Sequence, residues 1–126
     1  PMVTTDTTQL NRECNSWREN LRSYRNELGQ LRDQLTEMAR NQSDKEVLTE
    51  VEHYHNQFYI QQINIHDLKQ AIKTHDRKLQ LEAGLSENHL SSEIFSEHEQ
   101  LHQQYADLEN TISELRQDFS HFRARS

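Results

Sequence analysis

Residues that are mostly apolar recur along the chain at intervals that alternate between four and three residues. The first run is Leu10, Cys14, Trp17, Leu21, Tyr24, Leu28, Leu31, Leu35 and Met38. The second run is Val47, Val51, Tyr54, Phe58, Gln61, Ile65, Leu68, Ile72, His75 and Leu79. The third run is Ile94, His98, Leu101, Tyr105, Leu108, Ile112, Leu115, Phe119 and Phe122. This spacing averages about 3.5 residues and is the heptad signature of helices that pack along a narrow apolar stripe. The repeat positions therefore predict three long helices.

Capping residues divide the chain into those helices, because only two glycines and one proline are present to break them. Asp6 has the pattern of an N-cap, a Ser-x-x-Glu capping box begins at Ser43, and Gly84 is typical of the residue after a helix C-terminus. We expect one domain over residues 1–126, with helices over about 6–41, 43–83 and 86–124. Short connections place consecutive helices antiparallel, so the predicted fold is an all-α, antiparallel three-helix bundle of long coiled-coil-like helices.

The turn near Gly84 predicts which residues of the second and third helices face each other. Residue numbers that add up to about 173 should pair, which places His75 beside His98 and Tyr54 beside Phe119. The register of the first two helices is less definite, with sums between about 82 and 89. It predicts that Cys14 lies near Ile72 or His75. It also predicts that the Tyr24 phenol lies near the buried Gln61 amide.

The composition suits thin apolar stripes better than a thick core. The apolar set AVILMFWYC makes up 32% of the chain and charged residues 28%. Low hydrophobicity also fits disorder, but three uninterrupted heptad runs oppose that interpretation. The formal net charge of −7 argues against nucleic acid as a partner. A single cysteine excludes a disulfide within one chain, and no stretch approaches the roughly 18 apolar residues of a membrane span. We expect a soluble, cytoplasmic protein with no membrane partner.

Several apolar residues lie outside the repeat positions. They are Leu48, Tyr59, Ile60, Ile63, Leu81, Leu90 and Phe95. One interpretation is that they widen the stripe that touches both neighbouring helices. The other is that Tyr59, Ile60, Ile63 and Phe95 contribute to a face for a second copy or another protein.

The sequence His98-Glu99-Gln100-Leu101-His102 matches the H-E-x-x-H pattern of zinc hydrolases. On a helix the two imidazoles lie one turn apart and could bind one zinc ion, with Glu99 as the base. The extended pattern with a glycine and a third histidine is absent, since Tyr105 stands at the glycine position. A metal-binding or hydrolase-like protein is therefore the alternative interpretation.

The predicted His75–His98 layer has three interpretations. A polar layer inside a bundle can fix the helix register. Together with Cys14 it could bind a metal ion, for which His102 is a further candidate. Protonation of the layer between neutral pH and pH 5 could also lower the stability of the fold.

The segment Lys45–Lys73, KEVLTEVEHYHNQFYIQQINIHDLKQAIK, resembles the central helix of small uncharacterised helical proteins from Bacteroidota. In those proteins "EVEH-x-x-NQF" is followed by "I-x-x-L-x-x-x-I", and similarity is weaker in the helix that contains Trp17. The placement of Trp17 at a repeat position of the first helix also resembles spectrin repeats, which are three-helix units. The resemblances imply a bacterial helical bundle and assign no residue a role.

The sequence therefore favours a non-enzymatic interaction or scaffold protein. Its expected partner is another protein of unknown identity or a second copy of the chain. No cofactor and no catalytic residue is expected, and the candidates for metal binding are Cys14, His75, His98 and His102.

Overall fold

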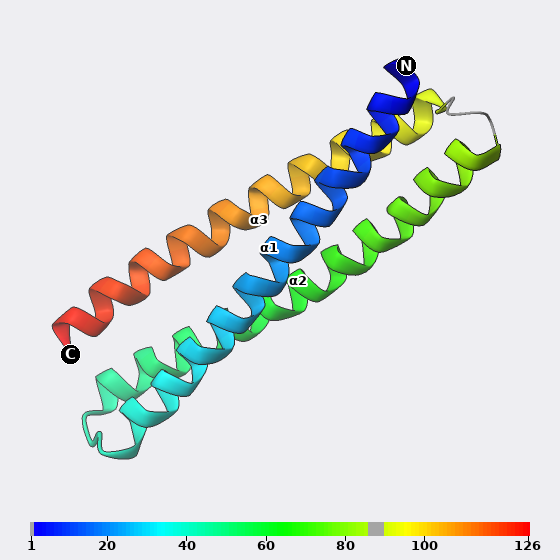
Figure 1. Ribbon diagram of the computed structural model, residues 1–126. Coiled ribbons are helices and arrows are strands. Elements are labelled where there is room, and N and C mark those ends of the chain that lie inside the picture. The colour runs from blue at the N-terminus through cyan, green and yellow to red at the C-terminus, as the bar shows by residue number, and fades with distance from the viewer. Residues whose placement is uncertain (1, 86–89) are drawn as a thin grey trace.

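The computed structural model describes residues 2–85 and 90–126, with side chains from Thr7 onward. Its helices are α1 (Met2–Arg40), α2 (Lys45–Leu85) and α3 (Ser92–Arg125), and no strand occurs in the described residues. The three helices form one elongated bundle (Figure 1). The prediction of an all-α three-helix bundle is confirmed.

Contacts between side chains show that α2 runs antiparallel to its neighbours. His75 contacts His98, and the rings of Tyr54 and Phe119 lie 5.6 Å apart. The residue numbers in both pairs add up to 173, as the position of the second turn predicts. Between α1 and α2, the Asn11 amide donates a hydrogen bond to Asp76.

Helices α1 and α3 run parallel, with their N-termini at the same end of the bundle (Figure 1). The Asn20 amide donates to the Tyr105 hydroxyl, and these residues are 85 positions apart. Farther along, Arg116 donates to Glu27 across a separation of 89. The second separation is four residues larger, which is about one helical turn. The long arginine side chain spans this turn, because side chains on a helix point back toward its N-terminus.

The core follows the repeat positions, none of which is exposed. One end of the bundle is filled by rings of Tyr54, Phe58, Phe119 and Phe122, whose centroids lie 5.2–6.3 Å apart. Leu90, which lies outside the repeat, is nevertheless buried with Leu79 and Ile94 near the other end. Of the two interpretations of the residues outside the repeat, the structure therefore favours a widened apolar stripe for Leu90.

The N-terminal boundaries of α1 and α2 differ from the predicted ones. α1 begins at Met2 rather than near residue 6, and the side chain of Asp6 lies outside the described residues. α2 begins at Lys45, and its cap is Asp44, whose Oδ1 accepts a 2.9 Å hydrogen bond from the Glu46 backbone N–H. Ser43 therefore does not cap the helix. An aspartate in this position satisfies a free backbone donor and also complements the positive end of the helix dipole.

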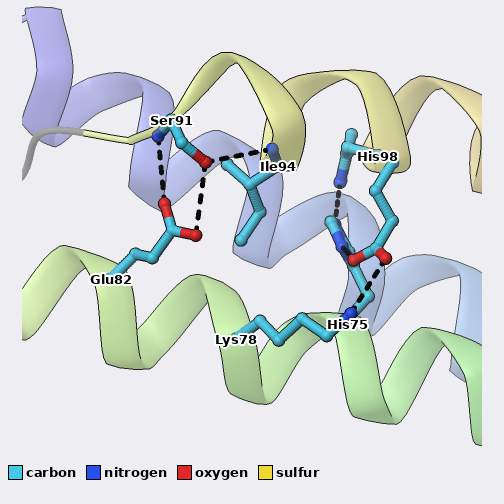
Figure 2. Close-up of polar contacts among 7 residues, drawn as sticks. His75, Lys78, Glu82, Ser91, Ile94 and His98 are labelled. Atoms are coloured by element: carbon cyan, nitrogen blue, oxygen red, sulfur yellow. Dashed lines mark hydrogen bonds and ion pairs between the residues drawn. The ribbon is translucent and has the colours of Figure 1, made fainter.

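The connection between α2 and α3 also differs from the prediction. α2 continues through Gly84 to Leu85, and α3 begins at Ser92, the last position of the range from Ser86 to Ser92 in which its start is expected. Residues 86–89, the earlier positions of that range, lie outside the described part of the chain. Ser91 caps α3 by accepting a hydrogen bond from the Ile94 backbone N–H, and the Glu82 carboxylate accepts from both the Ser91 backbone and hydroxyl (Figure 2). The cap is therefore anchored to α2.

The predicted hydrogen bond between the Tyr24 phenol and the Gln61 amide is not formed. The Tyr24 hydroxyl donates to the Glu109 carboxylate over 2.6 Å, and the Gln61 carbonyl accepts from Asn64 on its own helix. The cause is the parallel register of α1 and α3, which brings Glu109 opposite Tyr24. The hydrogen bond to Glu109 raises the pKa of Tyr24 to about 12.

Candidate functional site

Two buried histidines meet between α2 and α3, and each contacts a carboxylate on its other side. The Nε2 atom of His75 lies 2.9 Å from Nδ1 of His98 (Figure 2). Nδ1 of His75 lies 2.6 Å from Glu97, and Nε2 of His98 lies 2.7 Å from Glu13. We call the series Glu97–His75–His98–Glu13 the carboxylate–imidazole row. It joins all three helices.

The row lacks one hydrogen when both imidazoles are neutral. An ionised carboxylate only accepts hydrogen bonds, so the outer nitrogens, Nδ1 of His75 and Nε2 of His98, carry the ring hydrogens. Each neutral ring has only one such hydrogen. The inner nitrogens then face each other as two lone pairs 2.9 Å apart. One cation at the inner nitrogens, either a proton or a metal ion, would complete the row.

The electrostatics of the row follow from burial and from its charged neighbours. Burial lowers the pKa of His98, while the hydrogen bond to Glu13 acts in the opposite direction. The hydrogen bond from His75 lowers the pKa of Glu97, which also forms a 3.0 Å ion pair with Lys78. The structure therefore favours ionised Glu97 and opposes full protonation of His98.

Cys14 of α1 faces the two histidines and is fully buried. One donor atom from each of Cys14, His75 and His98 lies within 4.8 Å of the other two. Burial, followed by the charge of Asp76, raises the pKa of the Cys14 thiol to about 12. A thiol with these properties is a poor nucleophile at neutral pH, because the thiolate is the reactive form. The predicted proximity of Cys14 and His75 is confirmed.

The H-E-x-x-H segment is not gathered into one site. His98 is buried, whereas Glu99 and His102 are exposed. The His102 ring lies against Trp17, with 5.7 Å between centroids, and both ring nitrogens of His98 already have partners in the row. Among the described residues, His98 clusters with Cys14 and His75 and not with His102.

The four candidate interaction residues are exposed and do not widen the core stripe. The exposed fractions are 50% for Tyr59, 44% for Ile60, 43% for Ile63 and 40% for Phe95. The first three lie on α2, near the middle of the bundle, and Phe95 lies near the start of α3.

Sequence reasoning missed Glu13 and Glu97 as members of the row. Each directly precedes a repeat position, Cys14 and His98 respectively, and such flanking positions are often filled by solvated charges. The signal that could have found Glu13 is the parallel register of the outer helices, in which it lies opposite His98.

The fold and the row define an all-α three-helix bundle with a buried cysteine–histidine cluster. No protein-family model matches the chain, and comparisons with curated proteins and with solved structures find no similar chain. The resemblances to Bacteroidota proteins and to spectrin repeats therefore stay predictions. Within the described residues, no helix combines the length and apolar character needed to cross a bilayer.

The row predicts that acid destabilises the fold. His98, on α3, faces Glu13 from α1 and His75 from α2, and the charge of His102 on its own helix also acts on it. Because burial lowers its pKa below the ordinary 6.5, the unfolded chain takes up a proton more readily than the folded one. The stabilisation is therefore complete above about pH 6.5 and is lost as pH falls through the lower, folded pKa.

Thermal unfolding measured from pH 7.5 to pH 5 tests this prediction. The melting temperature should hold above pH 6.5 and fall below it. A His98→Phe variant should lose most of this slope between pH 6.5 and pH 5, whereas His102→Asn, which changes an exposed histidine, should retain it. A flat melting temperature in the unmodified chain would contradict the prediction.

Proposed function

We propose that the chain is a non-enzymatic interaction or scaffold protein that docks its partner on the outer side of α2. The observation that carries this proposal is the exposure of Tyr59, Ile60 and Ile63. Ile63 lies four residues after Tyr59 and three after Ile60, so the three side chains share one helical face. We call them the α2 face. The bundle buries its repeat positions without them, and neighbouring exposed apolar side chains are typical of interaction sites.

Basic side chains border the α2 face. The Arg32 guanidinium lies 5.0 Å from the centre of the Tyr59 ring. An open groove beside Ile63 is lined by Arg25, Arg32 and His66. A partner that covers the α2 face would therefore meet positive charge along the side that faces α1.

A second basic groove continues along α1 and α2. Its cationic side chains are Arg18, Arg22, Lys69 and Lys73. Burial lowers the pKa of Lys69, and the charges of Arg22 and Arg25 lower it further. This local positive surface stands out in a chain whose net charge is −7. It favours a partner whose apolar anchors are flanked by carboxylates, such as an acidic amphipathic helix.

A matched pair of variants tests the proposal. Tagged protein carrying Ile60→Glu and Ile63→Glu should lose its partners in quantitative affinity capture from cells of the source organism. The expected loss is about tenfold or more, because truncating an anchor in an apolar docking site costs at least 1–2 kcal/mol. The control is Leu81→Glu on the same helix, where the side chain is 62% exposed and stands apart from the α2 face.

Retention of a protein by the unmodified chain and the control, with loss from the double variant, supports the proposal. Equal capture by all three chains contradicts it. Sedimentation equilibrium of the same proteins identifies the case in which the partner is a second copy, because only the double variant should then be shifted toward monomer.

A further inference from the structure

We propose that Cys14, His75 and His98 bind one transition-metal ion of the zinc–copper class inside the bundle. The ligand atoms are Sγ of Cys14 and the two inner ring nitrogens, Nε2 of His75 and Nδ1 of His98. One residue comes from each helix, so the ion would join α1, α2 and α3 at a single point.

The distances are close to those of a preformed site. The donor atoms of the three residues already lie within 4.8 Å of one another. The inner nitrogens are 2.9 Å apart. Two imidazole nitrogens on one ion stand roughly 3.3–3.5 Å apart, given metal–nitrogen distances of about 2.0–2.1 Å. The rings therefore need to separate by only about half an ångström, a shift that small side-chain rotations supply.

The outer partners of both histidines match those of metal ligands. A histidine that binds a metal usually donates its other ring N–H to a carboxylate, which fixes the tautomer and the ring orientation. His75 meets this condition through Glu97 over 2.6 Å, and His98 meets it through Glu13 over 2.7 Å. These two contacts direct both remaining lone pairs toward the same point.

The proton balance of metal binding is met by exchange of the Cys14 thiol proton for the ion. The inner nitrogens need one cation to complete the row. Binding through Cys14 requires loss of the thiol proton, because the thiolate is the ligand. When a divalent ion enters, that proton leaves, and any proton held at the inner nitrogens leaves as well.

The donor set selects the class of metal. Thiolate and imidazole suit copper and zinc, whereas magnesium and calcium prefer oxygen ligands. A trigonal arrangement of two histidines and one cysteine is typical of protein copper sites. Zinc adopts the same donors when a fourth ligand, such as water, completes a tetrahedron. Glu13 and Glu97 serve the outer nitrogens and act as positioning residues.

Equilibrium dialysis under reducing, anaerobic conditions tests the proposal with Zn²⁺ alone and, separately, with Cu⁺ alone. We expect one ion per chain and a higher melting temperature with the ion bound. Cys14→Ser should weaken binding by about 100-fold or more, since even outer partners of metal ligands cost about 10–100-fold. The matched control is His102→Ala, which removes an exposed histidine outside the cluster and should bind like the unmodified chain.

Co²⁺ added to the unmodified chain supplies a readout that does not depend on the folding of any variant. Ligation by Cys14 should produce an intense thiolate-to-cobalt charge-transfer absorption that Zn²⁺ abolishes. Absence of this absorption together with no Zn²⁺ or Cu⁺ binding overturns the proposal. Binding that survives Cys14→Ser but is lost in His102→Ala also overturns it and favours the H-E-x-x-H segment. The ion with the lower dissociation constant, Zn²⁺ or Cu⁺, is identified as the preferred metal.

Discussion

Replacing Phe119 by alanine is expected to lower the free energy of unfolding by about 3–5 kcal/mol. The side chain is 2% exposed, and its ring packs against those of Tyr54, Phe58 and Phe122. Truncation removes buried apolar surface and three ring contacts, and it leaves a cavity that rigid helices cannot close. The melting temperature should fall by about 10 °C or more.

Chemical denaturation monitored by circular dichroism measures this effect. Phe95→Ala is the control, because the same residue type at 40% exposure stands on the same helix. It should change the free energy of unfolding by about 0.5 kcal/mol or less. Equal losses in the two variants would contradict the assignment of the aromatic cluster as the core of that end of the bundle.

The second large effect concerns the carboxylate–imidazole row. Replacing His75 alone by leucine leaves Nδ1 of His98 buried against an apolar side chain. It also removes the hydrogen bond that the Glu97 carboxylate accepts from His75. Such a buried, unpaired polar group costs about 1–3 kcal/mol, and loss of the charge-assisted bond to Glu97 adds to that cost. His98→Leu should have a similar effect, because it leaves Nε2 of His75 unpaired.

Replacing both histidines by leucine should cost less than the two single changes together. The double variant has an apolar layer with no unpaired nitrogen, and Glu13 and Glu97 are exposed enough to be hydrated. We expect a coupling free energy of about 1–2 kcal/mol in a double-mutant cycle. The cycle is measured with a chelator present, so that bound metal does not contribute. Strict additivity would show that the two rings do not depend on each other.

The heptad spacing was sufficient to predict the helices and the core, because each helix must bury one narrow stripe. The pairing of His75 with His98 followed from the position of one turn. The capping residue Asp44 could not be separated from Ser43 by pattern alone, since both side chains accept hydrogen bonds from a helix N-terminus. The burial of Leu90 depends on how the chain enters α3, which no repeat encodes.

The candidate site was only half predictable for a related reason. Cys14, His75 and His98 occupy repeat positions, so periodicity placed them in the interior. Glu13 and Glu97 lie beside the stripe, where a glutamate usually points to water. Their contacts depend on the relative rotation of neighbouring helices, which is set by packing across the whole bundle.

The two ends of the rod are stabilised by different means. Interlocked aromatic rings fill the end at Tyr54 and Phe119. Toward the other end, the buried polar rings of His75 and His98 interrupt the apolar core, and a smaller apolar cluster around Leu79 follows. Local opening should therefore require less energy near the histidines than near the rings. Backbone amides of α2 should exchange hydrogen for deuterium along a gradient, fastest from His75 toward Leu79 and slowest around Phe58. An occupied metal site would flatten that gradient, because the ion would link the three helices at the place where they separate most readily.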